Sequence, residues 1–178
     1  MRDLARGEME KIACVIALTA LLWSAVTPAL AEDGCDKFAW PLAREKALRA
    51  AADMPATKVG EALAALPKTA IKLQLEPGAE AAFVMPPERK PRSERWFGGA
   101  LRFPAPAKLG IYQVTLSDEA WIDVVQDGRY ARSVGSTGRG DCPGLRKSVR
   151  FDLGATPFIV QVSGVTSDST AVTIGPVE

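Results

Sequence analysis

Apolar and polar residues alternate along most of the chain from Thr69 onward. Ile71, Leu73 and Leu75 alternate with polar neighbours, and the same period of two recurs at 111–116, 121–125, 148–153, 158–163 and 172–174. Successive side chains of a strand point to opposite faces, so this period is typical of strands with one buried face. With further extended segments expected at 81–85 and 96–103, the pattern predicts about eight or nine short strands.

Turn-forming residues separate these strands. Asp127-Gly128 between two apolar segments predicts a tight hairpin, and Pro77-Gly78 predicts another turn. Residues 86–95 form a charged, proline-rich loop, and residues 133–143 form a glycine-rich stretch that we expect to be a long loop. Short strands with turns at this spacing predict a mainly β fold, a β-sandwich or jelly-roll-like domain, over 69–178.

A helical arm and a connector are predicted before the strands, over 32–68. Residues 33–53 are rich in alanine and charged residues, which favours a helix, and Pro41 suits its first turn. Phe38 and Trp40 are the apolar side chains expected to dock this arm on the body of the domain. Within the connector, residues 58–66 could form a short helical turn that ends at Pro67.

The first 31 residues are typical of a secretory signal peptide. Arg2, Arg6 and Lys11 precede an uncharged apolar run, and Ala29-Leu30-Ala31 offers small residues at both positions that a signal peptidase inspects. The alternative is an uncleaved anchor, because the run from Ile12 is long enough to span a bilayer. The cleavage motif favours removal after Ala31, whether translation starts at Met1 or at Met9. The mature protein would then be periplasmic or secreted, with no stable membrane span.

Cysteine content, net charge and the absence of histidine restrict the classes of function that this protein could have. Cys35 and Cys142 remain after cleavage, and such a pair in an oxidising compartment predicts a disulfide, the alternative being two free thiols. The net charge is +1, which supplies no bulk attraction for nucleic acid. The chain has no histidine, which excludes Ser-His-Asp and Cys-His catalysis and histidine-ligated metals. We therefore expect no cofactor and no metal site, and a non-enzymatic role is favoured over a catalytic one.

Five side chains are candidates for contacting a ligand. Exposed tryptophans could stack on a sugar or a peptide, and a carboxylate beside one of them could contact a sugar or act as an acid of raised pKa. A basic side chain in the 86–95 loop could meet an anionic glycan or a lipid headgroup. The structural alternative is that the aromatics are core or docking residues and that the charges are solvated. The candidates are Trp40, Trp96, Trp121, Asp123 and Arg95.

Two resemblances add expectations. The strand pattern of Gly110 to Leu116, Trp121 to Val125, Val149 to Leu153 and Phe158 to Gly164 resembles the C-terminal β-sandwich modules of secreted bacterial peptidases. The segment Cys35-Asp36-Lys37-Phe38-Ala39-Trp40-Pro41-Leu42, taken with Trp121-Ile122-Asp123-Val124-Val125, resembles a family of short exported proteins of Gram-negative bacteria. Some of that family carry the name homogentisate 1,2-dioxygenase, an activity that needs Fe(II) bound by histidines, and this chain has none.

Three hypotheses follow for the function. The leading one is an exported, non-enzymatic β-sandwich protein that binds a glycan, a peptide or another envelope protein. The second is a small hydrolase or lyase that uses carboxylates such as Asp123 and Asp118. The third is a structural accessory domain of an envelope complex.

Overall fold

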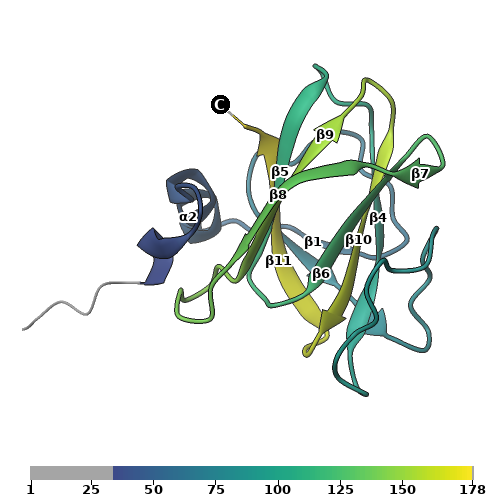
Figure 1. Cartoon of the computed structure of the whole chain (residues 1–178), viewed down its shortest axis with the longest axis horizontal. Helices are drawn as coiled ribbons and strands as arrows, with labels where there is room; N and C mark the ends of the chain where they lie inside the picture. Colours follow the sequence, from purple (N-terminus) through teal and green to yellow (C-terminus); the bar gives the residue numbers. More distant parts are fainter. Residues whose placement is uncertain (1–33, 178) are drawn as a thin grey trace, which may run out of the picture. The chain divides into compact units, whose positions relative to one another are not determined.

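Two β-sheets pack face to face in the computed structural model, which describes residues 34–177 (Figure 1). The predicted signal peptide, residues 1–31, lies outside the described residues. The first sheet has six strands in the order β1 (Ala56–Lys58), β2 (Ile71–Gln74), β11 (Ser169–Pro176), β5 (Gly110–Leu116), β9 (Lys147–Leu153), β8 (Arg132–Gly138). The second has five, in the order β3 (Glu76–Pro77), β4 (Phe97–Phe103), β10 (Phe158–Val165), β6 (Trp121–Gln126), β7 (Arg129–Tyr130). Neighbouring strands are antiparallel except for β1 and β2, and the predicted mainly β, sandwich-like fold is confirmed.

The core lies between the sheets and is built from alternate residues of each strand. Val114 and Leu116 of the first sheet and Val160 and Val162 of the second are all almost completely buried. Phe103 and Phe158, cross-strand partners in the second sheet, stack with ring centroids 5.1 Å apart. The period of two in the sequence therefore marks the faces that meet in the core.

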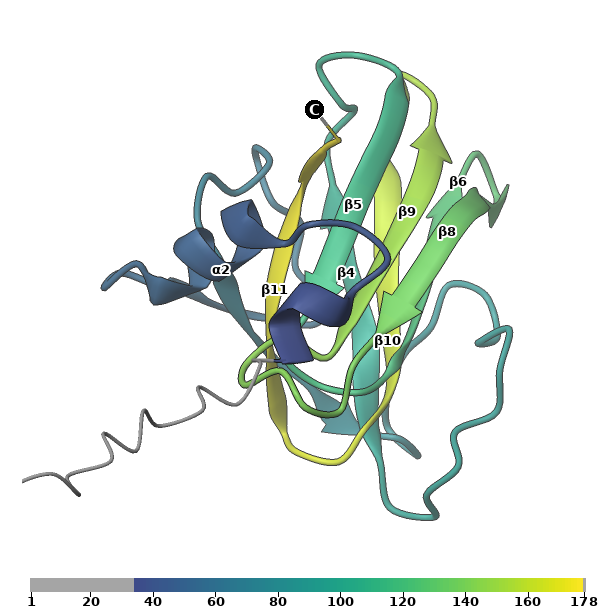
Figure 2. The same cartoon turned by 60° about the vertical axis from the view of Figure 1, so that its left-hand side comes forward.

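The N-terminal arm lies over the outer face of the first sheet, as the darkest part of the ribbon in Figure 2. It consists of a 3-10 turn, η1 (Gly34–Lys37), and a helix, α2 (Ala43–Ala50), which contacts β11. The predicted disulfide between Cys35 and Cys142 is confirmed, and it ties the arm to the loop between β8 and β9. Around the bridge is a small second core of Phe38, Leu42, Cys142 and Leu145.

The predicted helix over 33–53 is too long. The structure has an α-helix only from Ala43 to Ala50, and before it a single 3-10 turn over Gly34–Lys37 that does not continue into the helix. A proline disfavours helical geometry at the residue before it, here Trp40, so the helix can begin only after Pro41. The residues ahead of Pro41 are instead free to place Phe38 against the second core.

Three other local predictions are wrong. Residues 81–85 form no strand, and residues 58–66 form no helical turn but continue from β1 to a bridge between Ala62 and Arg102. The first half of the expected 133–143 loop is strand β8. This strand pairs only with β9 and most of its residues are exposed, so its sequence lacks the apolar alternation of a half-buried strand.

Candidate functional site

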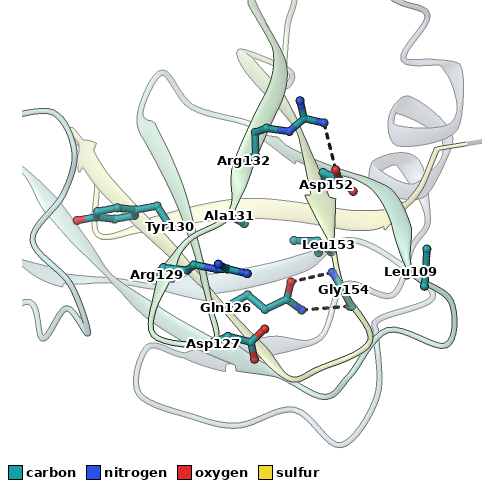
Figure 3. A pocket seen from close by; sticks show the side chains of 10 residues that line it. All are labelled: Leu109, Gln126, Asp127, Arg129, Tyr130, Ala131, Arg132, Asp152, Leu153 and Gly154. Atoms are coloured by element: carbon teal, nitrogen blue, oxygen red, sulfur yellow. Dashed lines mark hydrogen bonds and ion pairs between the residues drawn. The ribbon is translucent and has the colours of Figure 1, made fainter.

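An open cleft of about 540 Å³ lies at one end of the sandwich (Figure 3). It forms where the β6–β7 hairpin of the second sheet meets the end of β9 in the first sheet, and where the chain crosses from β7 to β8. Charged, aromatic and aliphatic side chains share its walls. The lining residues are Leu109, Gln126, Asp127, Arg129, Tyr130, Ala131, Arg132, Asp152, Leu153 and Gly154.

The hairpin turn fixes the position of the cleft's polar side chains. Asp127 and Gly128 have φ values of 53° and 73°, the left-handed conformation that a two-residue turn of this kind requires, as their sequence predicted. The Gln126 side chain then bridges to the opposite wall. Its amide nitrogen donates to the carbonyls of Gly154 and Thr156 at 3.1 and 2.8 Å, and its oxygen accepts from the Gly154 amide at 2.8 Å. These bonds hold the floor of the cleft rigid, because every polar atom of the buried Gln126 amide is used.

The charges in the cleft divide into one ion pair and two groups without an ion-pair partner. Arg132 and Asp152 pair at 3.2 Å, and both are substantially exposed. In the described part of the chain, neither Arg129 nor Asp127 makes an ion pair, and in Figure 3 the Arg129 side chain extends toward Gln126 and Leu153. A guanidinium in this state can donate a forked pair of hydrogen bonds to a carboxylate. Leu109 adds an exposed apolar side chain on the far side of the cleft, beyond Gly154.

Asp123 lies away from the cleft, under a loop. It faces outward from the second sheet, in a row with its cross-strand neighbour Gln161. Residues 79–95, here called the strap, cross this face without regular structure and cover it. Asp123 is only 2% exposed, and it accepts hydrogen bonds from the indole nitrogen of Trp121 at 2.6 Å and from the Glu88 amide at 3.2 Å.

Burial sets the protonation of this carboxylate. Desolvation raises the pKa of Asp123 from 3.8 to about 6, although its two hydrogen bonds work in the opposite direction. The neighbouring Glu88 carboxylate raises it further by repulsion. Desolvation raises the pKa of the Tyr130 phenol, and repulsion from the Asp123 and Glu88 carboxylates raises it further, so the three groups lie near one another where the strap crosses the sheet. The hydrogen bond from the Glu88 amide makes Asp123 an anchor of the strap.

Two further side chains hold the strap. The Gln161 oxygen accepts from the amides of Val84 and Met85 at 2.7 and 3.1 Å, and its nitrogen donates to the Met85 carbonyl at 3.0 Å. The Tyr130 hydroxyl donates to the Pro86 carbonyl. Every one of these contacts is to strap backbone, so the path of the strap is set by the sheet beneath it.

The three candidate tryptophans lie in three separate places, and none lines the cleft. Trp40 lies in the arm between η1 and α2, with the Arg150 guanidinium 4.2 Å from the centre of its ring and its indole nitrogen buried without a partner. Trp96 packs beside the strap, 6.1 Å from the Phe83 ring and close against Gly78. Trp121 begins β6 at the opposite end of that strand from the cleft.

Among the sequence candidates, the structure brings Trp121 and Asp123 together through a direct hydrogen bond. Arg95 is exposed on the strap and lies apart from that pair's contacts. The cleft residues Arg129, Arg132 and Leu109 were not among the candidates. The Asp127-Gly128 hairpin was a usable signal, because side chains that flank a tight turn at the end of a sandwich lie where binding loops gather.

Neither a metal cluster nor a membrane helix is found in the described residues. Between residues 34 and 177, no three Cys, Asp or Glu side chains gather as metal ligands would. No helix in that part of the chain combines the length and the apolar character that crossing a bilayer needs. Asp118, the other carboxylate considered for catalysis, accepts hydrogen bonds from Ser117 and Thr170 at 2.5 and 2.8 Å.

Comparison with known proteins adds no relative. The chain matches no protein-family model, no curated protein and no solved structure.

Proposed function

We propose that this is an exported, non-enzymatic binding protein that holds an acidic glycan or peptide in the cleft at the end of the sandwich. The observation that carries the proposal is the Arg129 guanidinium, which has no ion-pair partner in the described part of the chain and reaches into a cleft with aliphatic walls. The disulfide is consistent with a working place outside the cytoplasm, in the periplasm or beyond the cell.

The composition of the cleft favours binding of a short chain over binding of a single ion. A cleft of about 540 Å³ falls within the usual range for small-molecule sites. The Tyr130 ring points away from the other lining side chains, and its hydroxyl donates to the Pro86 carbonyl of the strap. Leu109, which is 75% exposed, and the partly buried Ala131 give the cleft apolar walls. A sugar acid or an acidic peptide presents a carboxylate for Arg129 and an apolar surface for these walls.

A carboxylate-dependent hydrolase is the weaker alternative. Such a reaction needs one carboxyl group protonated near neutral pH and a second nearby as base or nucleophile. Asp123 and Glu88 are adjacent and the pKa of Asp123 is suitably raised, but Asp123 is covered by the strap. In the cleft, Asp152 is engaged by Arg132.

Binding can be tested with two defined probes. We expect an acidic tripeptide or a uronic-acid disaccharide, titrated into the isotopically labelled protein after export from a bacterial host, to shift the amide resonances of 126–132 and 152–154 saturably. Arg129→Gln should weaken binding by roughly tenfold or more, since it removes a charge-assisted pair of hydrogen bonds. Arg95→Gln, an exposed arginine outside the cleft, is the matched control and should bind as the unmodified protein does. If neither probe shifts the cleft resonances, or if both variants bind alike, the proposal fails.

A further inference from the structure

A second site lies at the far end of the sandwich, where β6 and β9 begin. Two cations from distant parts of the chain meet there on the ring of one tryptophan. The Arg89 guanidinium of the strap is 4.5 Å from the centre of the Trp121 ring, and the Lys147 ammonium of β9 is 5.8 Å from it. The two charges can be no further apart than the sum of these distances.

Neither of these two cations, Arg89 and Lys147, is held in an ion pair by a carboxylate of the described residues. Partial burial lowers the pKa of Lys147, repulsion from Arg89 lowers it further, and the exposed carboxylate of Glu119 offsets this only in part. The Asp123 carboxylate accepts hydrogen bonds from the Trp121 indole N–H and the Glu88 amide, and pairs with neither cation.

A hydroxyl completes the arrangement. The Lys147 ammonium donates to the Ser136 hydroxyl at 2.8 Å, which leaves the hydroxyl hydrogen available to another acceptor. Ser136 is exposed on the edge strand β8, so the group is open to solvent on that side. A forked guanidinium, an ammonium and a hydroxyl are the donors that a tetrahedral oxyanion accepts from.

We propose that Arg89, Lys147 and Ser136 bind a phosphate group, supplied by a phosphorylated solute. Both cations already lie against the indole, which fixes their positions before the ligand arrives. A bound dianion would relieve their repulsion, and the attraction of each cation to the Trp121 ring would persist. The site is separate from the cleft, since its residues are at the opposite ends of β6 and β9, so either site can fail without the other.

Titration with inorganic phosphate, and in a second arm with glucose 6-phosphate, tests the site at constant ionic strength. We expect the Trp121 indole N–H resonance and the Ser136 and Lys147 amides to shift saturably, and the pKa of Lys147 to rise when the anion is bound. A response to both probes identifies the phosphate group as the recognised element, and a tighter response to the sugar phosphate identifies an ester as the source.

Variants separate this site from general attraction to a basic surface. Arg89→Gln and Lys147→Gln should each weaken phosphate binding by about tenfold or more, because each removes a charge-assisted donor. Arg92→Gln, an exposed cation of the same strap outside the cluster, should leave binding unchanged. The proposal is overturned if the shifts do not saturate, if equal chloride reproduces them, or if all three variants bind phosphate as the unmodified protein does. Far-ultraviolet circular dichroism confirms that each variant is folded.

Discussion

Replacing Asp123 with asparagine should change how the stability of the protein depends on pH. The folded-state pKa of about 6 lies above the ordinary value of 3.8, so the folded protein binds this proton more tightly than the unfolded chain does. Stability from this group therefore rises as the pH falls through the interval between those two values, and it is constant outside the interval. A difference of about two pH units corresponds to about 3 kcal/mol at most, and an asparagine contributes none of it.

The measurement is urea denaturation of the unmodified protein and of Asp123→Asn, from about pH 7.5 to about pH 4. Other carboxylates titrate in both proteins, so the difference in unfolding free energy isolates Asp123. We expect the unfolding free energy of the variant to decrease relative to that of the unmodified protein as the pH falls, by up to about 3 kcal/mol. Asp53→Asn, at an exposed aspartate, should show no such trend. The reasoning is refuted if the difference for Asp123→Asn stays constant with pH, or if nuclear magnetic resonance gives Asp123 an ordinary pKa.

Three further outcomes are expected. Replacing Cys35 and Cys142 together by serine should lower the unfolding free energy by roughly 2–5 kcal/mol, because the bridge closes a loop of 107 residues; an unchanged urea midpoint would contradict this. Gln161→Leu should speed tryptic cleavage within 89–95, because it removes three hydrogen bonds to the strap, each worth about 0.5–1.5 kcal/mol. Gln74→Leu, at an exposed glutamine, is the control. Equal cleavage rates for the two variants would show that Gln161 does not hold the strap. Phe158→Ala should cost roughly 3–5 kcal/mol in calorimetry or urea denaturation, since the ring is 1% exposed and stacks on Phe103, and a loss below about 1 kcal/mol would mean that the core closes over the cavity.

The strands that line the core could be predicted because burial of one face requires apolar residues at alternate positions of their sequences. Residues 110–116 and 158–165 alternate as strands do, and both are central strands of their sheets. The sequence of edge strand β8 lacks this alternation, because most of its residues are exposed and neither face of the strand has to be apolar. Residues 81–85 show the reverse. They are apolar enough to suggest a strand, but the amides of Val84 and Met85 and the carbonyl of Met85 bond to the Gln161 side chain and not to a neighbouring strand.

The candidate site was less predictable than the fold. Asp123 was identified beside Trp121 because both share one face of a strand, and their hydrogen bond follows from that placement. The strap covers this pair through tertiary contacts, and the sequence around Trp121 and Asp123 contains no signal for them. The cleft has the same origin, since Arg129, Asp152 and Leu109 belong to three segments far apart in the chain.

The way in which the strap is held has a consequence for how the protein could diversify. Three side chains hold the strap, those of Gln161, Asp123 and Tyr130. They bond to backbone atoms between Val84 and Glu88, so these hydrogen bonds do not depend on which side chains the strap carries there. Substitutions in the exposed strap residues would therefore leave its course over the sheet unchanged, while they alter the chemistry that it presents to the surroundings. The sheet and the strap together form a display scaffold, in which changes to exposed strap residues can alter ligand specificity with little loss of stability in the sheet.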